Sequence, residues 1–134
     1  MKKRIILLLA VVAAIFPMIA EDKVPVVTFE ETMHDFGMIK EEGGPVSCTF
    51  TFLNEGEAPL VIISASAQCG CTRPSFPQSP INPGKKGEIK VTFHPEGRPG
   101  EFIKEVKVKT NDKKHRTTKL KIMGVVIPYQ EEKR

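Results

Sequence analysis

The chain has 134 residues, 20 of them basic and 16 acidic, with a formal net charge of +4. Three of the basic residues lie within the first four positions, and the remaining 17 nearly balance the 16 acids, so the charge does not indicate a nucleic-acid-binding protein. A chain of this length suits a single domain with one modest core.

The N-terminus has the pattern of an export signal. The basic residues of MKKR precede an apolar run over 5–16, which is too short to span a bilayer well. The stretch PMIA then places the small residue Ala20 before a cleavage point at Glu21. We therefore predict a signal peptide over 1–20 and an exported protein, either periplasmic, held in the cell envelope or secreted. The alternative is an uncleaved segment, through which alone the chain would contact the membrane.

Alternation of apolar and polar residues predicts strands along the rest of the chain. In VSCTFTF, for example, Cys48, Phe50 and Phe52 share one face with Val46, while Ser and Thr occupy the other. In chain order the predicted strands are 25–30 (PVVTFE), 46–52 (VSCTFTF), 59–65 (PLVIISA), 88–93 (EIKVTF), 105–109 (EVKVK) and 118–122 (TKLKI).

Turn-forming residues separate these runs, and no stretch after the signal segment has a helical period. Short strands with turns about every ten residues are typical of an immunoglobulin-like β-sandwich. We therefore predict an all-β fold, a single sandwich of about seven strands over 21–127, followed by a polar C-terminal tail over 128–134.

The hairpin across 111–116 allows a register to be predicted. Apolar residues must face apolar residues, so the numbers of paired residues must sum to an even number; a slip of one residue would bury lysines. This register gathers four lysines on the opposite face. We interpret that face either as a solvated surface or as a basic patch that binds an envelope protein or an anionic envelope polymer. The lysines are Lys107, Lys109, Lys119 and Lys121.

Three cysteines are the residues best suited to chemistry. Cys48 is predicted to point inward and to act as a small buried hydrophobe. Cys69 and Cys71 flank Gly70, and such a pair oxidises readily in an exported protein. Their disulfide would close a very small ring, which is expected to be strained and easily reduced. A reduced pair can instead clamp Cu(I), whereas a closed four-cysteine zinc site is excluded because no second pair exists.

Three interpretations of the Cys-Gly-Cys stretch therefore stay open. It is a structural staple or two packed thiols, a metal site formed by Cys69 and Cys71, or a pair that exchanges disulfides. The sequence contains no G-x-S-x-G, no H-E-x-x-H and no glycine loop that would cradle phosphate. We expect no catalytic residue and no firmly bound cofactor, and we expect the scattered His34, His94 and His115 to be surface or loop residues.

The order of several motifs resembles a known bacterial family. The chain contains DFG.I, then F.F.N.G..PL.I, then CGCT, and finally I.PG..G.I.V.F.P.GRPG.F.K.V.V.TN. Over about 26–126 it resembles domain of unknown function 1573, in which similar sequences often carry histidine at the position of Cys48. The resemblance implies an immunoglobulin-like sandwich related in type to ASH, major-sperm-protein and hydin-like domains, which are mostly binding or scaffolding units.

These observations lead to one functional expectation and one alternative. We expect an exported, non-enzymatic binding or scaffolding module of the bacterial cell envelope, with no nucleic-acid partner. The alternative is a copper-handling or thiol-redox accessory protein that acts through Cys69 and Cys71.

Overall fold

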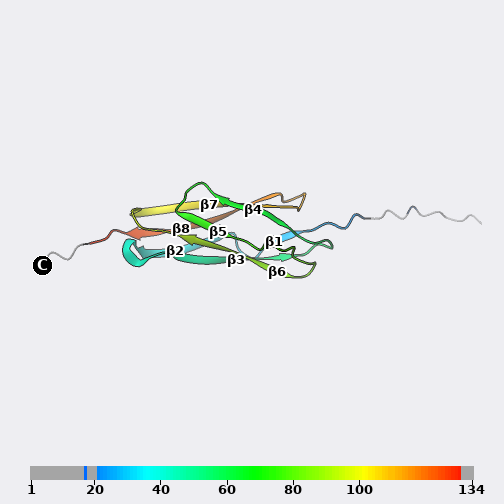
Figure 1. Ribbon diagram of the computed structural model, residues 1–134, viewed down its shortest axis with the longest axis horizontal. Coiled ribbons are helices and arrows are strands. Elements are labelled where there is room, and N and C mark those ends of the chain that lie inside the picture. The colour runs from blue at the N-terminus through cyan, green and yellow to red at the C-terminus, as the bar shows by residue number, and fades with distance from the viewer. Residues whose placement is uncertain (1–16, 18–20, 131–134) are drawn as a thin grey trace, which may run out of the picture.

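The computed structural model describes residue 17 and residues 21–130, so nearly all of the predicted signal segment and the last four residues of the predicted tail lie outside the described part. Two sheets pack face to face into an elongated sandwich, and the described chain enters and leaves it at opposite ends (Figure 1). Within the described residues, no helix combines the length and the apolar character needed to cross a bilayer.

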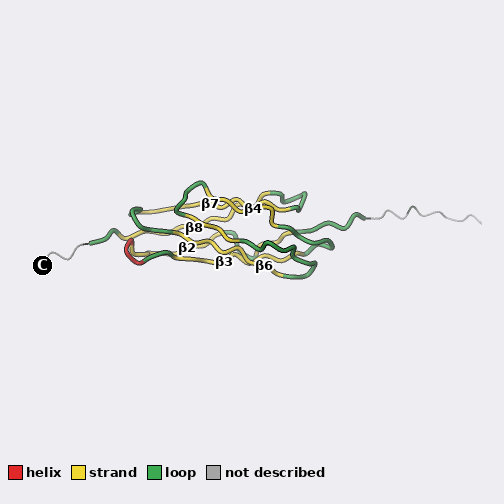
Figure 2. Tube along the Cα trace, viewed as in Figure 1, coloured by secondary structure: helices red, strands yellow, loops and turns green. Residues whose placement is uncertain are grey.

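Each sheet has four strands, and loops connect them at the two ends of the sandwich (Figure 2). The first sheet has the order β1-β3-β6-β5 and the second has the order β2-β8-β7-β4. The 3-10 turn η1 (Glu41–Gly43) follows β2. The strands are β1 (Val27–Phe29), β2 (Met33–Lys40), β3 (Val46–Asn54), β4 (Ile62–Ala67), β5 (Thr72–Ser75), β6 (Lys86–Phe93), β7 (Gly100–Thr110) and β8 (Thr117–Ile127).

The core lies between the sheets and is built from the inward residues of the alternating runs. Phe50 and Phe52 of β3 are 2% and 0% exposed, which confirms the predicted inward face of that strand. Phe93 of β6 stacks on Phe102 of β7 with ring centroids 4.0 Å apart and so joins the two sheets. Gly124 is paired opposite Phe102, and a Cβ there would crowd the ring, so this glycine makes room for the aromatic contact.

The predicted register of the last hairpin is confirmed. β7 and β8 are antiparallel, Val106 lies opposite Leu120 and Lys107 lies opposite Lys119. Both pairs sum to an even number, the apolar pair is buried and the lysines are exposed. β2 lies on the other side of β8 and runs parallel to it.

The six runs predicted as strands correspond to six of the eight strands in the described residues and leave out β2 and β5. β2 was missed because its alternation is interrupted at Gly37, which has φ +68° and lies within a β-bulge between Asp35 and Met38. β5 was missed because it contains Pro74, which a sequence pattern takes as a break. Since β5 is an edge strand, the missing N–H of proline is tolerated there.

Candidate functional sites: the outer sheet face and the disulfide loop

The four predicted lysines lie together on the outer face of the second sheet. We call Lys107, Lys109, Lys119 and Lys121 the lysine patch; all four are exposed. Lys107 is directly opposite Lys119, whereas Lys121 is opposite Glu105. Like charges placed directly opposite each other on paired strands destabilise a sheet. The Lys107–Lys119 pair therefore lowers the stability of the fold instead of supporting it.

Large apolar side chains occupy the other half of the same outer face. We call Met38, Ile103, Met123 and Val125 the apolar patch. Met38 is 73% exposed and Ile103 is 69% exposed. Ile103 lies opposite Met123, and Met38 lies beside Val125, so the four side chains are neighbours across three strands. They line a shallow hollow of about 290 Å³.

The sequence-based reasoning missed the apolar patch. The signal was present, because apolar residues at 103, 123 and 125 occupy the same outward parity as the lysines at 107, 119 and 121. The apolar patch could have been found by continuing the alternation of the hairpin past the predicted runs 105–109 and 118–122. These runs are parts of strands of 11 residues each. Met38 could not have been assigned, because the bulge at Gly37 shifts its parity.

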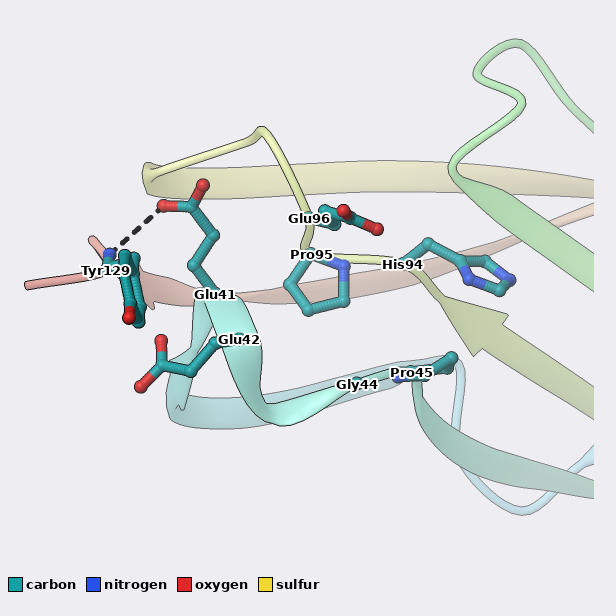
Figure 3. A pocket seen from close by; sticks show the side chains of 8 residues that line it. All are labelled: Glu41, Glu42, Gly44, Pro45, His94, Pro95, Glu96 and Tyr129. Carbon is teal, nitrogen blue, oxygen red and sulfur yellow. Dashed lines mark hydrogen bonds between the residues drawn. The ribbon is translucent and has the colours of Figure 1, made fainter. Parts of the chain in front are cut away.

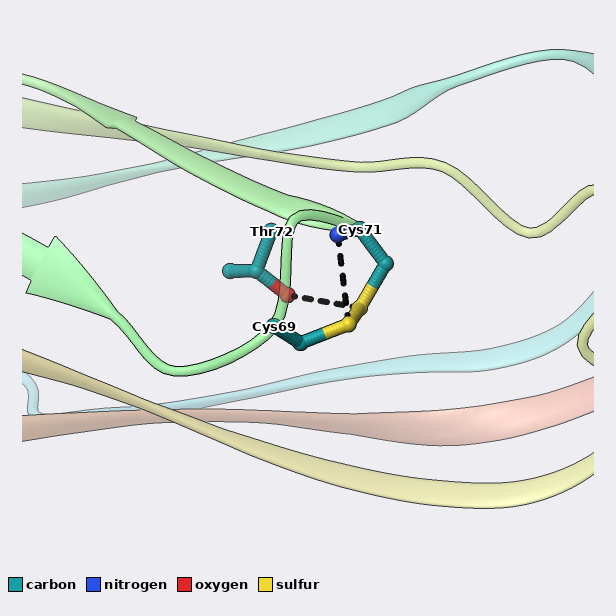
Figure 4. The surroundings of a disulfide bond; sticks show 3 residues. All are labelled: Cys69, Cys71 and Thr72. Carbon is teal, nitrogen blue, oxygen red and sulfur yellow. Dashed lines mark hydrogen bonds between the residues drawn. A yellow bond between two sulfur atoms is a disulfide. The ribbon is translucent and has the colours of Figure 1, made fainter.

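The Cys-Gly-Cys stretch forms a tight loop between β4 and β5, closed by a disulfide between Cys69 and Cys71 (Figure 4). The Cys71 N–H points to Cys69 Sγ at 3.2 Å, and the Thr72 hydroxyl lies 3.5 Å from Cys71 Sγ. The loop is also bound to the sandwich, because the His94 N–H donates to the Cys71 carbonyl at 2.8 Å. With its two sulfurs joined, the pair has no thiolate to offer a metal, so Cu(I) binding stays a prediction about the reduced protein.

The two bonded cysteines differ in burial. Cys71 is 2% exposed and belongs to the core, whereas Cys69 is only partly buried. Cys69 lines two hollows, of about 340 and 380 Å³, and Cys71 lines neither of them. Lys104 lines both hollows, so Cys69 shares each of them with a cationic residue.

The third cysteine is not part of this loop. Cys48 lies on the inward face of β3 and is 8% exposed, as predicted. Burial raises the pKa of its thiol to about 11, because the charged thiolate is disfavoured away from water. It is therefore expected to be chemically inert at neutral pH.

A further hollow, of about 570 Å³, lies where the described chain leaves the sandwich (Figure 3). Its residues include Glu41, Glu42, Glu96, His94 and Tyr129. The Glu41 carboxylate accepts hydrogen bonds from the N–H groups of Gly97 and Tyr129, each at 3.2 Å. Glu41 therefore fastens three segments together, and a structural role accounts for it.

The histidines do not assemble into a metal centre in the described residues, where no cluster of three or more His, Cys, Asp or Glu side chains could hold an ion. His34 packs edge to face against Phe36, with centroids 4.6 Å apart. His115 lies in the β7–β8 turn, and its Nδ1 lies 3.2 Å from the carboxylate of Asp112.

No curated protein sequence matches the chain, but solved structures share its fold. A protein of unknown function from Porphyromonas gingivalis W83 superimposes with a TM-score of 0.68 and 16% identity, over 82% of this chain and 50% of that chain. The VesB protease of Vibrio cholerae gives 0.61 and 11%, over 74% and 31%. The ASH / PapD-like domain 7 of human CEP192 gives 0.60 and 16%, over 80% and 89%.

These similarities establish an immunoglobulin-like sandwich, as predicted. The chain corresponds to half of the P. gingivalis chain and to less than a third of the VesB chain. The sequence pattern described as "Protein of unknown function (DUF1573)" matches residues 27–126, from the start of β1 to the last residues of β8. The match covers most of the chain and all eight strands, and the chain belongs to the DUF1573 family.

Proposed function

We propose that the chain is an exported, non-enzymatic binding module of the cell envelope, and that it holds a protein partner on the outer face of the β2-β8-β7-β4 sheet. The observation that carries the proposal is the division of this face into an apolar patch and a lysine patch. Exposed Met38 and Ile103 offer a partner an apolar surface of the kind found at the centre of protein interfaces. The lysines beside them favour acidic side chains on the partner.

The combination favours a protein over an anionic polymer. A polyanion would need only the lysines, and its binding would leave Met38 and Ile103 exposed to water. A partner segment with apolar side chains next to Asp or Glu would cover both patches. Burying an aliphatic side chain contributes about 1.5–3 kcal/mol, which is more than an exposed charge pair does.

The experiment compares capture from an envelope extract by the wild-type chain and by matched variants. We expect Lys107→Glu with Lys119→Glu, and separately Ile103→Asp, to lose the same partner. The controls are Lys85→Glu with Lys90→Glu, exposed lysines that lie away from the second sheet, and Val24→Asp, an apolar residue that is 43% exposed and precedes β1 of the first sheet. They make the same changes of charge or polarity and should keep the partner.

The captured protein is then purified and its affinity measured directly, with polyglutamate as a probe that offers charge alone. We expect added salt to weaken binding but not to abolish it, because exposed charges are screened and the apolar contact is not. Thermal stability should change by only ~0–1 kcal/mol in the lysine variants. A partner that tolerates Ile103→Asp, or polyglutamate that binds as tightly as the captured protein, would refute a mixed protein interface.

A further inference from the structure

We propose that the Cys69–Cys71 disulfide is a site of thiol–disulfide exchange, at which an incoming thiol attacks Cys69 and releases Cys71. This inference stands without the partner surface described above, although Ile103 and Lys107 of that surface also line one of the two hollows at Cys69. It rests on three features of the loop: the unequal exposure of its two cysteines, the hydrogen-bond donor beside Cys71 and the cations that line the hollows at Cys69.

Access decides which sulfur is attacked. Cys69 lines two hollows, whereas Cys71 is 2% exposed and packs in the core. An incoming thiolate can therefore approach Cys69 from either hollow. Exchange requires such contact with one sulfur of the disulfide, and access is one of the factors that set its rate.

The surroundings also fit the charges of the reaction. Lys104 and Lys107 line one hollow and Arg98 joins Lys104 in the other, with one carboxylate facing each hollow, Glu105 and Glu101 respectively. The cations outnumber the acids and so favour an anionic thiolate near Cys69.

On the other side of the bond, the leaving sulfur has a donor within reach. The Thr72 hydroxyl lies 3.5 Å from Cys71 Sγ and can donate to that sulfur as negative charge develops on it.

The exchange proceeds in two steps. A thiolate RS⁻, from a small-molecule or protein thiol, forms a bond to Cys69 Sγ. The Cys69–Cys71 bond breaks, and its electron pair leaves with Cys71 Sγ, which takes a proton. A second thiol then attacks the R sulfur of the mixed disulfide, so that two RSH are oxidised to RSSR and the cysteine pair is reduced to two thiols. If no second thiol arrives, Cys71 attacks Cys69 again and expels RS⁻.

A purely structural role explains the loop less well. A bond between residues two apart closes a ring so small that it removes little chain entropy from the unfolded state. The loop is also held independently, by the hydrogen bond from the His94 N–H to the Cys71 carbonyl and by the packing of Cys71.

The first test uses a matched pair of full-length variants. Cys71→Ser leaves Cys69 as the one thiol of the loop, and Cys69→Ser leaves Cys71. We expect the Cys69 thiol to react with an aromatic disulfide reagent at least tenfold faster than the Cys71 thiol at neutral pH. Equal rates, or a faster Cys71, would overturn the proposal. Buried Cys48 is present in both variants and serves as an internal thiol that should stay unlabelled.

The second test uses the wild-type chain, so it stands even if a variant fails to fold. The oxidised chain is treated with reduced glutathione, quenched in acid and alkylated, and the mixed disulfide is located by peptide fragmentation. We expect the adduct on Cys69, formed at least as fast in the folded chain as in the urea-unfolded chain. An adduct on Cys71, or a folded chain protected more than tenfold, would show a buried staple instead.

A third measurement tests whether Lys104 acts through its charge on the attacking thiol or only through its packing against the loop. Lys104→Gln should slow exchange with glutathione, which carries negative charge besides its thiolate, several-fold more than exchange with β-mercaptoethanol, whose only charge is the attacking thiolate. An equal effect on both thiols would contradict electrostatic attraction. A cysteine-containing peptide in place of glutathione then shows whether the hollows admit a protein thiol as well as a small one.

Discussion

Asn54, the last residue of β3, connects three segments through one fully buried side chain. Its amide donates to the carbonyls of Ala58 and Ile81 at 2.8 and 2.9 Å, and its oxygen accepts from the N–H groups of Gly56 and Val26 at 3.0 and 3.3 Å. A Cβ at position 56 would overlap the backbone of the segment that precedes β1, so only glycine allows this approach. The pattern N.G in the sequence therefore has a structural cause.

Asp112 has the same role in the β7–β8 turn. Its carboxylate accepts from the Val27 N–H at 3.1 Å, which joins β1 to the turn across 85 positions, and from the Lys114 N–H at 3.0 Å. Burial alone would raise the pKa of this carboxyl, but the hydrogen bonds from Val27, Lys114 and His115 outweigh it and lower the pKa below the ordinary value.

We expect Asp112→Asn to destabilise the protein at pH 7 by about 1–3 kcal/mol, because the new amide cannot accept all of these hydrogen bonds. A carboxyl whose folded-state pKa is lowered contributes stability above its unfolded pKa of about 3.9 and loses it as the pH falls through the folded value. The difference between wild type and variant should therefore shrink between pH 5 and pH 3 in urea titrations. The same difference at both pH values would contradict this account.

Among the elements, the β-strands and the Cys-Gly-Cys loop differ in what they contribute to stability. β3 supplies Phe50 and Phe52 to the core, and neither can be removed without leaving a cavity. The loop is attached to an already packed sandwich, and Pro74 and Pro77 restrict the chain that follows it. The disulfide is thus expected to be dispensable for folding, whatever its chemistry.

We expect Phe50→Ala to cost roughly 3–5 kcal/mol through the cavity it creates. Cys69→Ser with Cys71→Ser should cost on the order of 1 kcal/mol, the size of an ordinary substitution. Thermal melts of the two variants give the comparison. The reduced wild-type chain should be titrated with Cu(I) in parallel, with the double serine variant as its control. A double variant that fails to fold would make the loop a structural element.

The same elements show what the sequence could and could not predict. The β7–β8 register could be predicted because the two faces of the hairpin differ sharply in polarity. A slip of one residue would bury Lys107 in place of Val106. The lysine patch followed from that register. β2 could not be placed, because its partner residues in β8 lie 87 or 88 positions further along the chain and its bulge at Gly37 breaks the alternation. The two-residue spacing of the cysteines could not show that only one of them is accessible.

For the whole molecule, the parallel pairing of β2 with β8 has a mechanical consequence. β2 lies near the start of the domain and β8 ends it, and the described ends leave the sandwich in opposite directions (Figure 1). When the two chain ends are pulled apart, β2 and β8 are therefore drawn past each other along their length. Their hydrogen bonds then bear the force together, in shear. Such a domain would resist unfolding when it is pulled at its two ends.

Single-molecule stretching can measure this resistance. With handles beyond Glu21 and Tyr129, we expect a single high-force rupture when the β2–β8 pair gives way. Moving the second handle to Lys113, in the β7–β8 turn, should peel strands apart one bond at a time and lower the rupture force. Equal forces in the two geometries would mean that the parallel pair bears no load, whereas a lower force from the turn would mean that this sandwich is strongest along the line of its own chain ends.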